Sequence, residues 1–145
     1  MKIQLMSVGR IKADPTAPLV DDYTGRIAKF IPFEEVVLKA NDAQAEEKMH
    51  KAADRAAITV AMDERGQQHD SFAFADLMAS WMNAGHGRVL FLIGGADGLP
   101  PGIRQRADLS LGLSRMTLPH RLARLILVEQ MYRALCIIRN VPYQK

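Results

Sequence analysis

The sequence has very little cysteine, and this excludes several classes of protein. Its single cysteine, Cys136, cannot form a disulfide within the chain, so a disulfide-stabilised scaffold is excluded. The few histidines are scattered without metal-ligand spacing, and we therefore expect no metal site: they are His50, His69, His86 and His120. The 48% apolar and 24% charged residues exclude a disordered tail and predict one globular domain over residues 1–145.

Long apolar runs are also absent. Val89–Ile93 and Leu125–Val128 are among the longest, and both are far shorter than the roughly 20 residues that span a bilayer. The N-terminus does not have the pattern of a signal peptide, because Lys2 leads directly into a short strand-like run. We therefore expect a reduced, cytoplasmic protein with no membrane partner.

Positive charge is concentrated at one end of the chain. The net charge is +3, but residues 101–145 carry eight Lys or Arg against two acidic residues, whereas residues 1–100 carry 11 against 14. A basic segment of this kind is typical of a protein that binds a phosphate-rich partner. A solvated surface whose arginines pair locally explains the same pattern.

Predicted strands and helices alternate along the chain. Strands are expected at 3–8, 33–38, 58–62, 88–93 and 109–113, and helices at about 19–30, 71–83 and 119–138. A further helix is capped by Asn41 or Asp42 and runs to about Ala56, and a short one begins at Pro100–Pro101. Asp63–Gly66 is predicted to close the third strand. The alternation predicts an α/β fold with a parallel sheet covered on both faces.

A glycine-rich turn follows the most apolar predicted strand. The segment Gly94–Gly98 comes directly after Val89–Ile93, which places it at the carboxyl end of a central parallel strand, where open α/β sheets bind ligands. It is not a dinucleotide fingerprint, and no Gly-Lys-Ser/Thr of a phosphate-binding loop follows it. Taken alone, the turn is explained equally well by a purely structural role.

The last predicted helix is apolar around almost its whole circumference between Leu122 and Ile138. Such a helix must be buried on two sides. One side can pack on the sheet, and the other predicts a C2 homodimer. The alternative is a monomer whose N-terminal helices cover the second side.

Several ordered segments match the motifs of one family: Met1–Ile3 with Val8–Gly9, Met62–Gly66, Phe91–Leu99, Leu113–His120 and Glu129–Ala134. On these residues the chain resembles, from its first strand to its end, the small bacterial methyltransferases that modify the N3 atom of a pseudouridine in large-subunit 23S rRNA. These belong to the SPOUT, or α/β-knot, class. The resemblance implies a C-terminal trefoil knot, a dimer, and a substrate in helix 69 of the assembled ribosome.

The resemblance also implies that S-adenosylmethionine is the cofactor, held bent within the knot loops. The cofactor-binding residues carried over from the family are Met62, Gly94, Gly95, Gly98, Ser114, Arg115, Met116, Thr117, Leu118 and Pro119. The catalytic residues carried over are His120, Arg133 and Tyr143, and the RNA-binding residues are Arg121, Arg124 and Lys145.

Methyl transfer to an imide nitrogen requires both partners to be oriented and a proton to leave. His120 can orient the base or accept this proton, or it can be a capping or packing residue at a helix start. For Glu129, a salt bridge with Arg133 one turn later is preferred to a catalytic role.

The tail departs from the family pattern. Residues 140–145 keep Pro142 and Tyr143 but lack both tail histidines, since Val141 and Gln144 replace them, and Lys145 replaces an arginine. The proton acceptor is therefore open between His120, Gln144 with solvent, and simple positioning. A non-catalytic ribosome-binding or rRNA-binding protein on the same scaffold is the alternative function.

Overall fold

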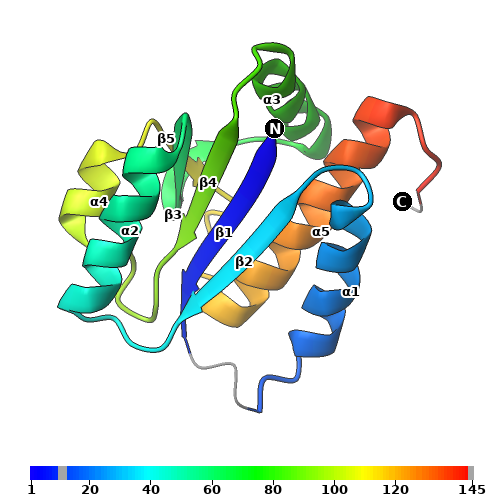
Figure 1. Ribbon diagram of the computed structural model, residues 1–145. Helices are drawn as coiled ribbons and strands as arrows, with labels where there is room; N and C mark the ends of the chain where they lie inside the picture. The colour runs from blue at the N-terminus through cyan, green and yellow to red at the C-terminus, as the bar shows by residue number, and fades with distance from the viewer. Residues whose placement is uncertain (10–12, 144–145) are drawn as a thin grey trace.

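The computed structural model describes residues 1–9 and 13–143. Its centre is a sheet whose strands pair in the order β2-β1-β4-β3-β5, and all of these pairings are parallel (Figure 1). The strands are β1 (Lys2–Val8), β2 (Phe33–Leu38), β3 (Ile58–Gln68), β4 (Arg88–Ile93) and β5 (Leu109–Gly112). The expected α/β fold with a parallel sheet is confirmed.

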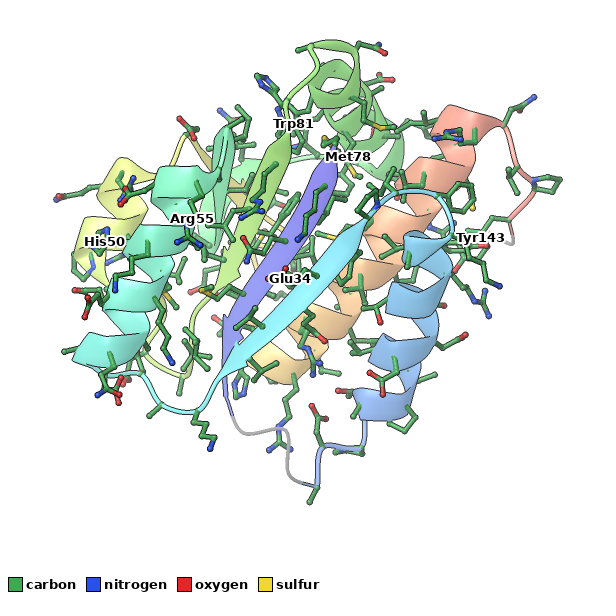
Figure 2. All side chains as sticks on the ribbon, viewed as in Figure 1. Glu34, His50, Arg55, Met78, Trp81 and Tyr143 are labelled. Atoms are coloured by element: carbon green, nitrogen blue, oxygen red, sulfur yellow. The ribbon has the colours of Figure 1, made fainter. Side chains whose placement is uncertain are left out.

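Helices cover both faces of the sheet (Figure 1). They are α1 (Ala17–Ala28), α2 (Ala43–Arg55), α3 (Ser71–Asn83), α4 (Pro101–Arg106) and α5 (His120–Arg139). One apolar core joins the sheet to α1, α3 and α5, and a second joins it to α2 and α4. In the first core Met78 and Trp81 reach from α3 toward the sheet (Figure 2), and Trp81 meets Phe91 of β4 edge-on with 6.0 Å between ring centroids.

The helices begin where short polar or proline residues precede them. Of the two expected caps for α2, Asp42 is used: its carboxylate accepts a hydrogen bond from the Ala45 amide at 2.9 Å. Asp70 caps α3 through the Ala73 amide at 2.7 Å. None of the helices within the described ranges is long and apolar enough to cross a membrane.

The expected end of the third strand is wrong. β3 does not stop at Met62 but continues to Gln68, because it pairs with β5 twice: Leu111 lies opposite Met62 and, after a bulge, opposite Gln67. A β-carbon at Gly66 would lie 2.6 Å from the backbone of Ser110, so glycine permits this close approach. Asp63–Gly66 is therefore a bulge within the strand, and it brings polar side chains to the carboxyl edge of the sheet.

Candidate functional site

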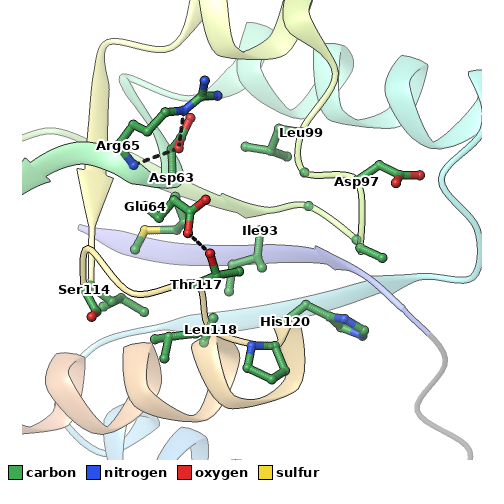
Figure 3. Close-up of a pocket in the computed structure, with 18 of the residues that line it drawn as sticks. Asp63, Glu64, Arg65, Ile93, Asp97, Leu99, Ser114, Thr117, Leu118 and His120 are labelled. Atoms are coloured by element: carbon green, nitrogen blue, oxygen red, sulfur yellow. Dashed lines mark hydrogen bonds and ion pairs between the residues drawn. The ribbon is translucent and has the colours of Figure 1, made fainter.

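A cavity of about 670 Å³ lies at the carboxyl edge of the sheet (Figure 3). Its walls come from the bulge of β3, the turn after β4, the loop after β5 and the first turn of α5. The side chains and backbone around it belong to residues 62–65, 93–99, Arg104, Leu111, 113–114, 116–120 and Ala123. The volume falls in the range of about 300–1,000 Å³ that is typical of small-molecule sites.

Two positions of the turn after β4 call for glycine, Gly94 because of space and Gly98 because of its backbone conformation. A β-carbon at Gly94 would lie 2.3 Å from the carbonyl carbon of Gly98, closer than any real contact. Gly98 itself has φ of +78° and donates its amide hydrogen to the Gly95 carbonyl at 3.0 Å. The three glycines of this turn leave parts of the wall without side chains, where a ligand can reach the backbone.

The loop after β5 forms the facing wall and is tied to β3. The Thr117 hydroxyl donates a hydrogen bond to the Glu64 carboxylate, which joins the loop to the bulge (Figure 3). Within the loop, the Met116 amide donates to the Ser114 hydroxyl at 3.0 Å. The loop after β5 is thus fixed to the β3 bulge on one side of the cavity.

Charges of both signs line the cavity: the carboxylates of Asp63, Glu64 and Asp97 and the guanidinium groups of Arg65 and Arg104. Asp63 accepts a hydrogen bond from the Arg65 amide at 2.9 Å, and Arg104 lies 3.8 Å from its other oxygen. The Arg65 amide, and after it the charges of Arg65 and Arg104, hold the pKa of Asp63 below its usual value. Asp63 is therefore ionised at neutral pH.

The structure gathers nearly all of the predicted cofactor-binding residues at this cavity. Those that line it are Met62, Gly94, Gly95, Gly98, Ser114, Met116, Thr117, Leu118 and Pro119. Arg115 does not line it and is exposed. His120, predicted to be catalytic, is part of the wall. The structure shows that these residues lie around one cavity. Their roles in binding a ligand stay predictions.

The other two predicted catalytic residues lie elsewhere. Tyr143 lies beside α1 and α5 (Figure 2), where its hydroxyl donates to the Glu129 carboxylate at 2.8 Å and lies 3.2 Å from the Tyr23 hydroxyl. Burial, and after it these two contacts, raises the pKa of Tyr143. Arg133 binds Glu129 at 2.7 Å, which confirms the expected salt bridge. Arg133 lies 13 positions after His120 in α5, a rise of about 20 Å.

The predicted RNA-binding residues differ in how far the structure exposes them. Arg124 is buried, and its guanidinium makes two hydrogen bonds to the Glu35 carboxylate, at 2.6 and 2.8 Å. This geometry argues against a direct contact with RNA, because the cation is desolvated and already paired. Arg121 is half-buried, and Lys145 lies outside the described residues.

Several cavity residues escaped the sequence analysis. The sequence predicts that Asp63, Glu64 and Arg65 close a strand, and it marks Asp97 only as part of the glycine turn. Arg104 comes from α4, whose start at Pro100–Pro101 the sequence predicts, but nothing in the sequence marks Arg104 as a site residue. A run of charged residues directly after an apolar strand was the available signal for the first three.

The chain matches a known family along nearly its whole length. Residues 1–144 match the family described as "Predicted SPOUT methyltransferase". Proteins named "Ribosomal RNA large subunit methyltransferase H" from Anaeromyxobacter sp. (strain Fw109-5) and Sorangium cellulosum (strain So ce56) are each 40% identical to it. The alignment covers 100% of both chains in the first case and 99% of both in the second.

Solved structures with the same fold are much more distant in sequence. A probable methylase family protein from Haemophilus influenzae Rd KW20 has a TM-score of 0.62 at 11% identity, covering 99% of this chain and 70% of that one. A probable methyltransferase from Bordetella pertussis Tohama I has a TM-score of 0.61 at 12% identity, covering 92% and 95%. The fold, the full-length match and the curated relatives agree, and the chain belongs to the SPOUT methyltransferase family.

Proposed function

We propose that this protein is an S-adenosylmethionine-dependent methyltransferase of ribosomal RNA, acting on the N3 atom of a pseudouridine in helix 69 of 23S rRNA in the assembled ribosome, in the cytoplasm. The observation that carries the proposal is the likeness at 40% identity, over the full length, to relatives named as large-subunit rRNA methyltransferases. Three of the family-like segments contribute residues to the cavity: Met62–Gly66, Phe91–Leu99 and Leu113–His120.

The cavity suits S-adenosylmethionine in size and chemistry. Gly94, Gly95 and Gly98 leave backbone groups open to an adenine edge, and the apolar side chains of Ile93, Leu99, Leu111, Leu113 and Leu118 offer a surface for its ring. Asp63 is paired with Arg65 and Arg104, and the carboxylates of Glu64 and Asp97 complement a ligand that carries a sulfonium and an ammonium. When bound, the cofactor supplies a methyl group on a positively charged sulfur.

The chain's own residues contribute orientation and proton removal. An in-line displacement needs the acceptor nitrogen on the side of the methyl group opposite the sulfur. The turn after β4 and the loop after β5 would orient the cofactor so that its methyl group faces the substrate. His120 lies in the wall, where its imidazole can orient the target base or accept the imide proton. Arg133 and Tyr143 lie at the other end of α5, too far away to act at this cavity. We therefore assign them to the substrate that is bound at the cavity of a second copy of the chain.

A second copy of the chain would provide that cavity. One face of α5 exposes Leu122 at 43%, Ile126 at 37% and Ile137 at 36%, and Glu129 and Arg133 lie on the same face at helical spacing. Burying this stripe in a C2 homodimer would carry the Arg133 end of one protomer toward the cavity end of its partner. The trefoil knot implied by the family is part of this proposal.

The test is transfer of a labelled methyl group. The protein is incubated with methyl-labelled S-adenosylmethionine and with ribosomes from a strain that lacks the modification, and the labelled nucleotide is located by mass spectrometry. We expect one label on a pseudouridine of helix 69. Cofactor binding without any label, together with salt-sensitive RNA binding, would replace the proposal with the non-catalytic alternative that the altered tail suggests.

A further inference from the structure

A buried ion cluster lies at the start of α5, outside the cavity. Arg124 is bound to Glu35 through two hydrogen bonds and lies 3.6 Å from an oxygen of Asp14. The side chains of Arg124, Asp14 and Glu35 are only 8%, 2% and 17% exposed. Buried ion pairs often add little stability compared with apolar residues of the same size, so this cluster calls for another explanation.

The cluster joins three parts of the chain that are distant in sequence. Glu35 belongs to the edge strand β2, Asp14 precedes α1, and Arg124 lies in α5. Asp14 is itself held, because its carboxylate accepts hydrogen bonds from the Thr16 amide at 2.9 Å and the Thr16 hydroxyl at 2.7 Å. Together these contacts immobilise the guanidinium and, through it, the first turns of α5.

His120 lies one helical turn before Arg124 and contacts Gly9 at the end of β1. A β-carbon at Gly9 would lie 2.6 Å from the His120 Nε2 atom and 2.9 Å from its Cδ2 atom. The imidazole therefore occupies the space that any other residue at this position would fill. A second hollow, of about 10 Å³, is lined by Gly9, Asp14, His120 and Arg124 among others, so the ring and the ion cluster share one wall.

We propose that Arg124, held by Glu35 and Asp14, is a positioning residue that keeps His120 against Gly9 and so places the imidazole in the cavity wall. This assigns Arg124 to the geometry of the site in place of the RNA contact predicted from the sequence. The inference rests on the proposed function only for the kinetic consequence of moving His120. The placement of His120 itself can be measured without any reaction.

The test uses three variants that disturb the arrangement from different directions. Arg124→Lys keeps the charge but loses the two parallel hydrogen bonds, and Glu35→Gln removes the partner charge. Gly9→Ala places a β-carbon against the imidazole at a backbone φ of +150° and changes no group of the ion cluster. Arg106→Lys is the matched control, because Arg106 forms an ion pair with Asp54 at 2.8 Å on the surface, away from His120.

Two measurements are made on each protein. The first is the side-chain NMR signal of His120 in the free protein, assigned with His120→Asn. The second is the steady-state kinetics of ribosome methylation. We expect the three variants to shift the His120 signal and to lower kcat roughly 10–100-fold, with the KM for ribosomes changed by less than about twofold, while Arg106→Lys changes neither.

Two results would overturn the inference. One is an unmoved His120 signal in the folded variants. The other is a raised KM for ribosomes in Arg124→Lys, with unchanged kcat and a salt dependence weaker by about one phosphate contact, which would make Arg124 an RNA ligand. If Arg124→Lys does not fold, Glu35→Gln and Gly9→Ala decide. If the wild-type protein does not methylate, the proposed function fails and the NMR signal alone decides this inference.

Discussion

Individual residues in this protein are constrained most strongly where backbone meets backbone or where charge is buried. Gly94 and Gly66 are surrounded by backbone atoms at distances that leave no room for a side chain. Asp14 is the most deeply buried carboxylate of the described ion pairs, with 2% of its side chain exposed. Substitutions at such positions have effects that can be stated in advance, because the neighbouring atoms cannot move away cheaply.

Gly94→Ala should damage the cavity. The new β-carbon would meet the Gly98 carbonyl carbon at 2.3 Å and the Leu99 amide nitrogen at 2.5 Å. We expect a loss of about 1–3 kcal/mol in the free energy of unfolding and loss of binding of S-adenosylhomocysteine, measured by urea unfolding and calorimetry. The control is Gly25→Ala in α1, where no atom lies within 4 Å and a gain of about 0.4–1 kcal/mol is expected. Undiminished ligand binding by Gly94→Ala would show that the turn does not form the site.

Asp14 should make stability depend on pH. Although burial alone would raise its pKa, hydrogen bonds from Thr16 and the charges of Arg121 and Arg124 lower it in the folded protein. Its stabilising contribution is then complete above about pH 5 and is lost as the pH falls through the folded-state value, below about 3.9. We therefore expect Asp14→Asn to be less stable than wild type at pH 7, and the difference to shrink toward pH 2.

Urea unfolding followed by the fluorescence of Trp81 measures this difference. The control is Asp54→Asn, whose side chain is 66% exposed and whose effect should stay within about 0.5 kcal/mol at every pH. A difference for Asp14→Asn that is constant from pH 7 to 2 would contradict the argument.

At the scale of elements, local capping and pairing determine where helices and strands end. Asp42 and Asp70 fix where α2 and α3 begin, because their carboxylates accept hydrogen bonds from amides of the first helical turn. β3, in contrast, is extended by its partner β5, whose Leu111 pairs on both sides of the bulge. Helix starts were therefore visible in the local sequence, whereas the extension of β3 depends on a strand about 50 residues later in the chain.

Asp70→Ala should destabilise the protein by about 1 kcal/mol. The substitution removes the acceptor that binds the Ala73 amide at 2.7 Å, and Asp70→Asn should restore most of the loss. The exposed Asp76 within the same helix provides the control, since Asp76→Ala should change the free energy of unfolding by no more than about 0.5 kcal/mol. Equal effects at both positions would show that Asp70 does not act as a cap.

For the whole molecule, the exposed stripe of α5 and the separation of Arg133 from the cavity lead to the same expectation. A single chain leaves Leu122, Ile126 and Ile137 exposed on one helix face. The same face carries Arg133, which one chain cannot bring to its own cavity because the rigid helix holds it about 20 Å from His120. Both features are accounted for if two copies associate through α5.

Ile126→Glu should therefore produce a folded monomer. Ile126 is 37% exposed in the single chain, so a charge there is tolerated by the fold but not by an apolar interface. Sedimentation velocity should show a dimer for wild type and for Ile126→Val, and a monomer with native circular dichroism for Ile126→Glu. A monomeric wild type would rule out this interface.

Mixed dimers should recover activity from two inactive variants. Gly94→Ala disables the cavity and Arg133→Ala disables the other end of α5. If each site takes its cavity from one protomer and Arg133 from the other, random mixing restores about one quarter of the wild-type rate, because half of the dimers are mixed and each of those has one intact site. No recovery after verified subunit exchange would place Arg133 and the cavity in the same protomer or outside the reaction.

The amino-acid sequence by itself determined the alternation of strands and helices, the glycine turn after β4, a cap for α2 at Asn41 or Asp42, and the salt bridge between Glu129 and Arg133. These features depend on periodicity, on backbone freedom at single residues and on neighbours one turn apart, and all of that information is local. The resemblance to the methyltransferase family came from ordered motifs along the same chain, and the full-length matches confirmed it.

Only the tertiary structure decided which charges are buried and which residues meet. In the sequence, Arg121 and Arg124 are two equivalent arginines of one basic segment. In the structure, Arg124 is enclosed by Glu35 and Asp14, which lie about 90 and 110 residues away in the chain. The contact of His120 with Gly9 and the separation of Arg133 from the cavity have the same origin. Long-range packing sets the solvent exposure and partners of each side chain, and therefore whether an arginine in this chain is a surface cation or a buried support of the site.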